Sequence, residues 1–174
     1  MCIRDSNQVK VLLFFDVGGS MDDHIRVCEE MFSACRTEFK HLEYFYFHNC
    51  MYESVWKDNR RRHTEKSDLW EVLRTYPQDY KVIFVGDASM SPYEITYEGG
   101  SVEHWNEEAG GLWLQRVTEI YENCVWLNPI AERYWEHTPS LQIVKQIFGE
   151  RMFPLTLEAV SYTHLTLPTM WYVG

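Results

Sequence analysis

Two short apolar runs constrain the fold of this chain more than any other feature. Val9 to Phe15 is apolar apart from one lysine, and the run from Lys81 to Val85 is apolar after its first residue. Continuous apolar runs of this length are typical of strands that are buried on both faces of a sheet. The chain is therefore expected to build its core around a buried sheet.

Strand and helix patterns alternate along the rest of the chain. Further strands are expected at residues 42–47, 51–56, 124–127 and 152–155, and helices at 22–39, 68–76, 111–121 and 139–148. The segment 51–56 has the alternation of an antiparallel edge strand. Residues 88–110 are expected to form a long loop. Strands separated by helices predict an α/β class: a Rossmann-like, doubly wound, mainly parallel sheet with one antiparallel edge strand and helices on both faces.

The two ends of the chain have an unusual relationship. Residues 1–6 and 160–165 correspond to translations of one transposon-end sequencing adapter, read once in each orientation. Such segments are excluded from fold reasoning, as any engineered scar would be. We therefore expect residues 1–6 and 160–174 to be adapter-like scars, and residues 7–159 to be one domain that is truncated at its C-terminal end.

Composition narrows the functional class. The chain is 45% apolar, which suits a folded domain, and its formal net charge is -10. An acidic domain is a poor partner for nucleic acid or for an anionic membrane. Outside the scars the cysteines have no metal-ligand spacing, which favours a reducing, cytoplasmic location. Core or interface packing is expected of Trp105, Trp113, Trp126 and Trp135, and the loop aromatics Tyr93, Tyr97 and Trp105 are also candidates for a partner surface.

Acidic and hydroxyl side chains follow the two buried strands. The first strand runs into Asp16, Gly18 and Ser20, and the strand at 81–85 runs into Asp87. In open α/β sheets, ligands bind beyond the carboxyl ends of the strands, where the strand order reverses. Two carboxylates with a few hydroxyls at one sheet edge suit a hard cation such as Mg²⁺, which takes oxygen ligands and retains several waters.

These loops resemble those of von Willebrand factor A (VWA) domains. The element order, the pattern Asp-x-Gly-x-Ser after the first strand and the later Asp resemble that family and its metal-ion-dependent adhesion site, over nearly all of residues 9–157. The segments Phe15–Met21 and Val85–Glu94 are most similar to bacterial CoxE-like VWA proteins. The resemblance implies a non-enzymatic binding domain that captures an acidic side chain of a protein partner, such as a MoxR-type AAA+ ATPase in assembly or metal-centre maturation.

The resemblance also implies a ligand set. Asp16 and Ser20 would bind the metal from the first loop, Asp87 from the later loop, and Ser67 or Thr64 would supply a middle hydroxyl. The expected ion is Mg²⁺, with Mn²⁺ or Ca²⁺ as alternatives. The family has Ser where this chain has Gly18, so one hydroxyl ligand is missing. Ser67 has a competing structural interpretation, because serine just before a helix is a common cap.

Two other functional classes remain open. A haloacid-dehalogenase-like phosphatase would use Asp16 as its nucleophile, but Gly18 stands where that chemistry needs a general acid, and Ser91 stands where it needs another acid. The second alternative is an interaction module that keeps the fold without a metal. The motifs of serine hydrolases and of nucleotide-binding loops are absent from the sequence.

Overall fold

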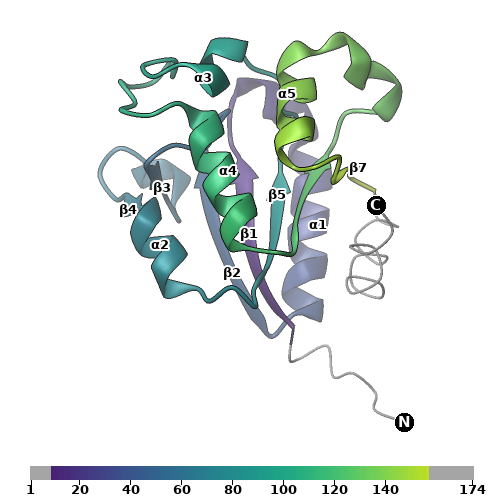
Figure 1. The fold of residues 1–174 in the computed structure, drawn as a ribbon. Helices are drawn as coiled ribbons and strands as arrows, with labels where there is room; N and C mark the ends of the chain where they lie inside the picture. Colours follow the sequence, from purple (N-terminus) through teal and green to yellow (C-terminus); the bar gives the residue numbers. More distant parts are fainter. Residues whose placement is uncertain (1–8, 157–174) are drawn as a thin grey trace.

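The computed structural model describes residues 9–156 as a parallel sheet between two helical layers (Figure 1). The strands are β1 (Lys10–Asp16), β2 (His41–Phe47), β3 (Ser54–Val55), β4 (Ser67–Asp68), β5 (Lys81–Val85), β6 (Cys124–Asn128) and β7 (Met152–Pro154). The α-helices are α1 (Ile25–Glu38), α2 (Leu69–Thr75), α3 (Pro92–Thr96), α4 (Gly110–Ile120) and α5 (Pro139–Ile147). Short 3₁₀ helices are η2 (Gly19–His24), η3 (Asn59–Arg61) and η4 (Glu132–His137). Both expected scars lie outside the described residues, as do the first and last few residues of the expected domain.

The main sheet has the order β2-β1-β5-β6-β7, and every pair in it is parallel. Successive side chains of a strand point to opposite faces. Thus Leu12 and Phe14 of β1 join the core under α2, α4 and α5, whereas Leu13 and Phe15 join the core under α1. Figure 1 shows α1 on one face of the sheet and these three helices on the other. The predicted fold class is confirmed, with helices on both faces.

The antiparallel element differs in detail from the expectation. Only Ser54–Val55 forms a strand within residues 51–56, and it pairs with β4 in a separate two-stranded sheet. A single antiparallel bridge between Tyr46 and Trp56 connects this small sheet to the edge of β2. The physical reason is burial: Met51, Tyr52, Val55 and Trp56 are all buried, so the segment turns into the core instead of presenting alternating faces.

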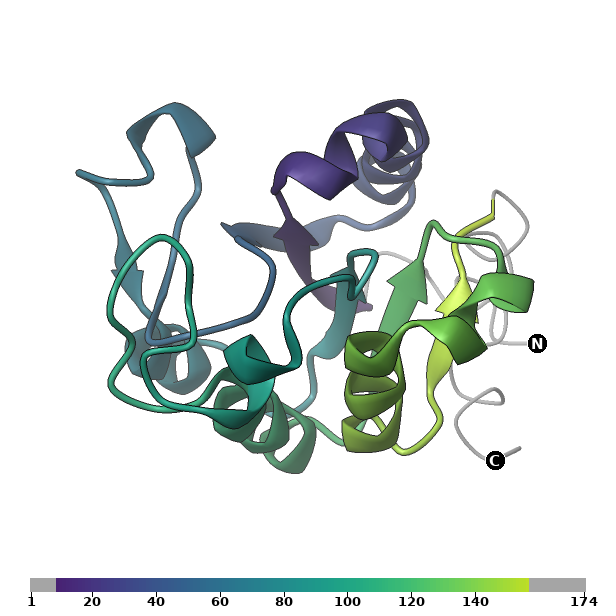
Figure 2. The same cartoon turned by 90° about the horizontal axis from the view of Figure 1, so that it is seen from above.

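The segment 88–110 is also more structured than expected, because it contains α3. Ser91 caps this helix by accepting a hydrogen bond from the backbone N–H of Tyr93, and Pro92 occupies the first turn. Proline suits that position because its missing N–H would have no helical partner. Figure 2 shows α3 beside the loops at the carboxyl ends of the strands. Within residues 9–156, no helix combines the length and apolar character needed to cross a membrane.

The first expected helix is divided in two. The 3₁₀ helix η2 precedes α1, and the apolar stripe of α1 is only partly covered. Cys35 and Phe39 are buried, but Ile25 is 51% exposed and Cys28 is only partly buried. The N-terminal half of the stripe is therefore available to line a cleft.

Candidate functional site

Asp16 and Asp87 come together where the strand order reverses. From β1 the chain adds β2 on one side of the sheet and β5 on the other, so β1 and β5 flank the reversal point. Phe15 pairs with Val85 in register, which sets Asp16 opposite Gly86. A Cβ built on Gly86 would lie 2.9 Å from Cβ of Asp16 and 3.4 Å from its Oδ2. A glycine is needed at this position for the two strand ends to approach so closely.

Asp16 is a buried carboxylate with incomplete hydrogen bonding. Asp16 is only 3% exposed to solvent. Oδ1 accepts a hydrogen bond from the backbone N–H of Asn49 at 2.9 Å, but Oδ2 is buried and has no hydrogen-bond partner. An unpartnered buried oxygen on a charged group is costly, and such a group in a native structure requires an explanation.

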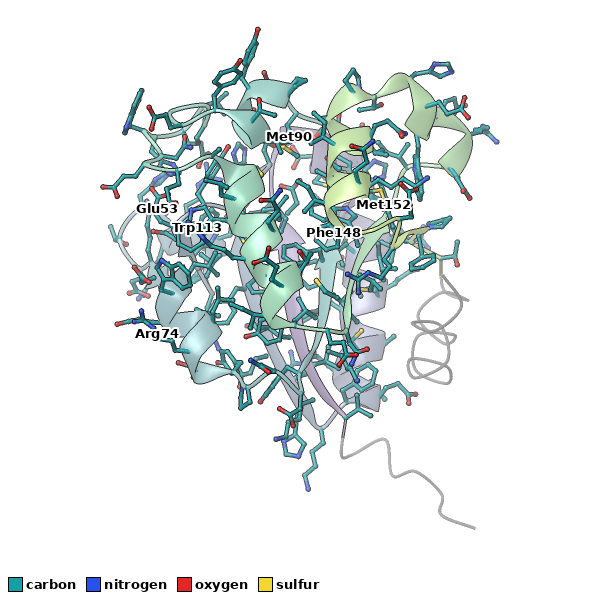
Figure 3. All side chains as sticks on the ribbon, in the orientation of Figure 1. Glu53, Arg74, Met90, Trp113, Phe148 and Met152 are labelled. Atoms are coloured by element: carbon teal, nitrogen blue, oxygen red, sulfur yellow. The ribbon has the colours of Figure 1, made fainter. Side chains whose placement is uncertain are left out.

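The turn that carries Asp87 is held from both neighbouring elements. Asn128 on β6 donates from Nδ2 to the backbone oxygen of Asp87, and Ser140 on α5 donates from Oγ to the backbone oxygen of Ala88. Ser140 Oγ also accepts a hydrogen bond from the backbone N–H of Met90. Figure 3 shows Met90 between α3 and α5. Ala88 has φ of 55°, a conformation that few non-glycine residues adopt. The surrounding hydrogen bonds hold this turn in a strained conformation, as is common at functional sites.

A third carboxylate lies beside this pair. Glu94 on α3 is 3% exposed, and its carboxylate accepts hydrogen bonds from Nδ2 of Asn49 at 3.3 and 3.5 Å. The backbone oxygen of Glu94 accepts from the hydroxyl of Tyr52. Sequence reasoning missed Glu94 and Asn49 as site residues. The signal for Glu94 was the Ser91-Pro92 helix start, which predicts a helix in the supposed loop.

The electrostatics of this cluster favour neutralisation. Burial, followed by the neighbouring charge of Asp87, raises the pKa of Asp16 from 3.8 to about 8; the Asn49 N–H opposes the shift, and Glu94 adds to it. Burial also raises the pKa of Glu94, against the hydrogen bond from Asn49. No lysine, arginine or histidine within residues 9–156 forms an ion pair with Asp16, Asp87 or Glu94. The charge of His48 lowers the pKa of Glu94, against the effect of burial, but Asp16 and Asp87 have no ion-pair partner among the described residues.

An open cleft of about 480 Å³ adjoins Asp16. Its walls are formed by the loop after β1, the uncovered stripe of α1 and the end of β2. Arg62, in the segment after η3, also lines the cleft. The apolar lining residues include Phe15, Val17, Met21, Ile25, Phe32 and Tyr46. Ligand sites typically combine a mainly apolar lining of this size with a few polar groups.

The predicted hydroxyl ligands are placed less favourably than the two acids. Ser20 lies on η2, in the same loop as Asp16, and is exposed. Ser67 lies on β4 of the small sheet and pairs with Val55, and Thr64 is exposed and bonds to the backbone oxygen of Arg61. Among the described residues neither Ser67 nor Thr64 forms a hydrogen bond with Asp16 or Asp87. The cap of α2 is Asp68 and not Ser67: the side chain of Asp68 accepts from the N–H of Glu71.

The described residues contain no group of three or more His, Cys, Asp or Glu side chains already arranged to hold a metal ion. A cation at this edge would therefore depend on few protein ligands. The features that fit one are the buried, unpartnered Oδ2 of Asp16 and the adjacent Asp87. Comparisons with protein-family models, curated proteins and solved structures find no match to this chain.

Proposed function

We propose that this chain is a cation-dependent protein-binding domain that holds Mg²⁺ at the carboxyl edge of its sheet and captures an acidic side chain of a partner. The observation that carries the proposal is the environment of Asp16. Its Oδ2 is buried without a hydrogen-bond partner, next to Asp87 and Glu94, and no basic side chain within residues 9–156 forms an ion pair with Asp16 or Asp87. A divalent cation would supply the missing positive charge.

Mg²⁺ suits a site with few protein carboxylates. It requires oxygen ligands in a near-octahedral shell and keeps several waters, so one or two carboxylates can suffice. Asp16 and Asp87 would hold it, with Ser20 and Ser67 as the proposed hydroxyl ligands; Mn²⁺ and Ca²⁺ are alternatives of similar ligand preference. When bound, the cation would offer an open position to an incoming carboxylate.

The surroundings of the site fit a protein partner. The cleft next to Asp16 gives a route to the strand edge, and its apolar lining can pack against the residues that flank an acidic side chain. Aromatic side chains on and after α3 are also exposed: Tyr93 at 64%, Tyr97 at 59% and Trp105 at 72%. Exposed aromatic residues are characteristic of interface anchors. The proposed partner is a MoxR-type AAA+ ATPase, and the proposed location is the bacterial cytoplasm. Both proposals rest only on the resemblance of the two loops to those of CoxE-like proteins.

Magnesium calorimetry tests the proposal. The wild-type chain should release or absorb heat on titration with Mg²⁺ at about pH 7.5. This pH is only slightly below the raised pKa of Asp16, about 8, so the cation can displace the proton of the carboxyl group. Asp16→Ala should abolish this signal because the buried ligand is removed. Asp22→Asn is the matched control: Asp22 is an exposed acid that lines the same cleft, so its loss should leave binding intact. Equal and negligible heat from wild type and Asp16→Ala would refute the cation site and favour the metal-free module.

A further inference from the structure

Asn49 connects Asp16, after β1, with Glu94 on α3 through separate polar groups. Its backbone N–H donates to Oδ1 of Asp16 at 2.9 Å, and its side-chain Nδ2 donates to Glu94. It lies just after β2, has φ of 56° and is the central residue of a tight turn in which the N–H of Cys50 donates to the backbone oxygen of His48 at 2.7 Å. Asparagine tolerates this left-handed conformation better than most residues.

The orientation of the Asn49 amide leaves its oxygen facing the loop after β1. Nδ2 of the amide donates to both carboxylate oxygens of Glu94, so Oδ1, on the other side of the planar amide, points away from Glu94. A Cβ built on Gly18 would lie 2.9 Å from this Oδ1 and 2.9 Å from Nε2 of His48. No hydrogen bond to Asn49 Oδ1 is formed among residues 9–156. Any side chain at position 18 would therefore compete with Asn49 and His48 for the same space.

We infer that Asn49 Oδ1 is a further oxygen ligand of the cation, and that Gly18 is the residue that leaves room for it. This inference rests on the proposed function. The amide oxygen is neutral, so it adds a ligand without adding charge to a cluster that already contains three acids. It also occupies the space that a side chain at position 18 would fill, which explains how the site can lack a hydroxyl at that position.

The alternative is that Asn49 acts only as a structural clamp on Asp16 and Glu94. The two roles are separable because its contacts come from different atoms. Asn49→Gly retains the backbone N–H that binds Asp16 and is compatible with positive φ, but removes the amide oxygen. Glu94→Gln keeps the side-chain shape at position 94 and removes its charge. Adding Gly18→Ser to Asn49→Gly puts a hydroxyl oxygen into the space that the amide leaves.

Calorimetric titration with Mg²⁺ decides between these roles, with urea unfolding in EDTA to verify that each variant is folded. Asn49→Gly should weaken Mg²⁺ binding at least about tenfold, as loss of a metal-site residue commonly does. In Asn49→Gly/Gly18→Ser the amide is gone and only the ring end of His48, which can rotate away, still lies 2.9 Å from the new Cβ, so the double variant should recover part of that loss. Gly18→Ser alone should weaken binding because its side chain meets both Asn49 and His48.

Three results would overturn the inference. If wild type binds Mg²⁺ and Asn49→Gly binds it equally well, Asn49 is not a ligand, although the proposed function stands. If Asn49→Gly is weak, Glu94→Gln is equally weak and the added serine restores nothing, Asn49 is only a clamp. If wild type itself does not bind Mg²⁺, the proposed function fails, and the inference fails with it.

Discussion

The side-chain Nδ2 of Asn128 donates a hydrogen bond of 2.9 Å to the backbone oxygen of Asp87. Asn128 is fully buried at the end of β6, and its Oδ1 accepts from the N–H of Ile130, so one amide satisfies groups on two loops. The position of the second acid in the candidate site therefore depends on a residue that cannot reach a ligand itself.

Replacing Asn128 by Ala should destabilise the protein and weaken cation binding. The change leaves the buried carbonyl of Asp87 without its partner, which typically costs roughly 1–3 kcal/mol. Urea unfolding gives the free energy of unfolding, and calorimetry gives the Mg²⁺ affinity. Asn123→Ala is the control, because the side chain of Asn123 forms no hydrogen bond among the described residues. Equal stability of the two variants would contradict this role.

Adding one methyl group at Gly86 should disturb Asp16. The new Cβ would meet Cβ of Asp16 at 2.9 Å and Cζ2 of Trp126 at 3.0 Å, and both neighbours are themselves buried. Overpacking of this kind costs typically about 1–3 kcal/mol. Gly86→Ala should therefore lower both the melting temperature and the Mg²⁺ affinity. Gly19→Ala, with no heavy atom within 4 Å of the added carbon, should change neither; the same loss in both variants would argue against a specific contact.

The stability of the cation-free protein should fall as the pH rises from about 4 to about 8. In this window the folded state keeps a proton on Asp16, whose pKa is raised from 3.8 to about 8, while the unfolded state has lost it. The contribution of Asp16 to the free energy of unfolding is therefore fully present below pH 4. It is lost as the pH approaches 8, at a rate on the order of 1.4 kcal/mol per pH unit. Urea unfolding in EDTA at a series of pH values measures it.

The pH dependence has two controls. Asp16→Asn should remove most of the slope because it has no proton to lose, and saturating Mg²⁺ should reduce it in wild type because the cation stabilises the carboxylate. Glu94 acts in the same direction, so a smaller slope should remain in Asp16→Asn. An unchanged slope in Asp16→Asn would place the titrating group elsewhere.

The phosphatase alternative predicts hydrolysis of a generic aryl phosphate that is lost in Asp16→Ala. We expect no such activity with Mg²⁺ present, because Gly18 supplies no general acid two residues after Asp16. Release of the coloured phenol by wild type measures this directly. Turnover that disappears in Asp16→Ala but persists in Asp22→Asn would support the enzyme and contradict the binding domain.

The parts of the fold that were predictable from sequence are those with a strong local pattern. The buried runs of β1 and β5 leave few alternatives, and two parallel strands that end in Asp16 and near Asp87 must bring both acids to the same edge of the sheet. The pairing of residues 51–56 was not predictable, because the burial of Met51 and Tyr52 depends on tertiary contacts with distant elements.

The missed site residues had weak or no local signals. Glu94 follows a Ser-Pro helix start that does indicate a helix, but its burial among other acids is contrary to what a charged residue in a loop suggests. Asn49 carries no motif. Its role depends on a left-handed turn after β2 and on the absence of a side chain at Gly18, which only the folded chain brings together.

A crystal of the protein soaked in Mn²⁺ is the sharpest test of the cation site at Asp16, because anomalous scattering locates this ion independently of the refined protein atoms. We expect one peak at the carboxyl edge of the sheet, bound by Oδ2 of Asp16 and linked to Asp87 directly or through one water, and no peak there in Asp16→Ala crystals. An empty edge in wild-type crystals, with Asp16 and Asp87 side by side as they are here, would contradict it.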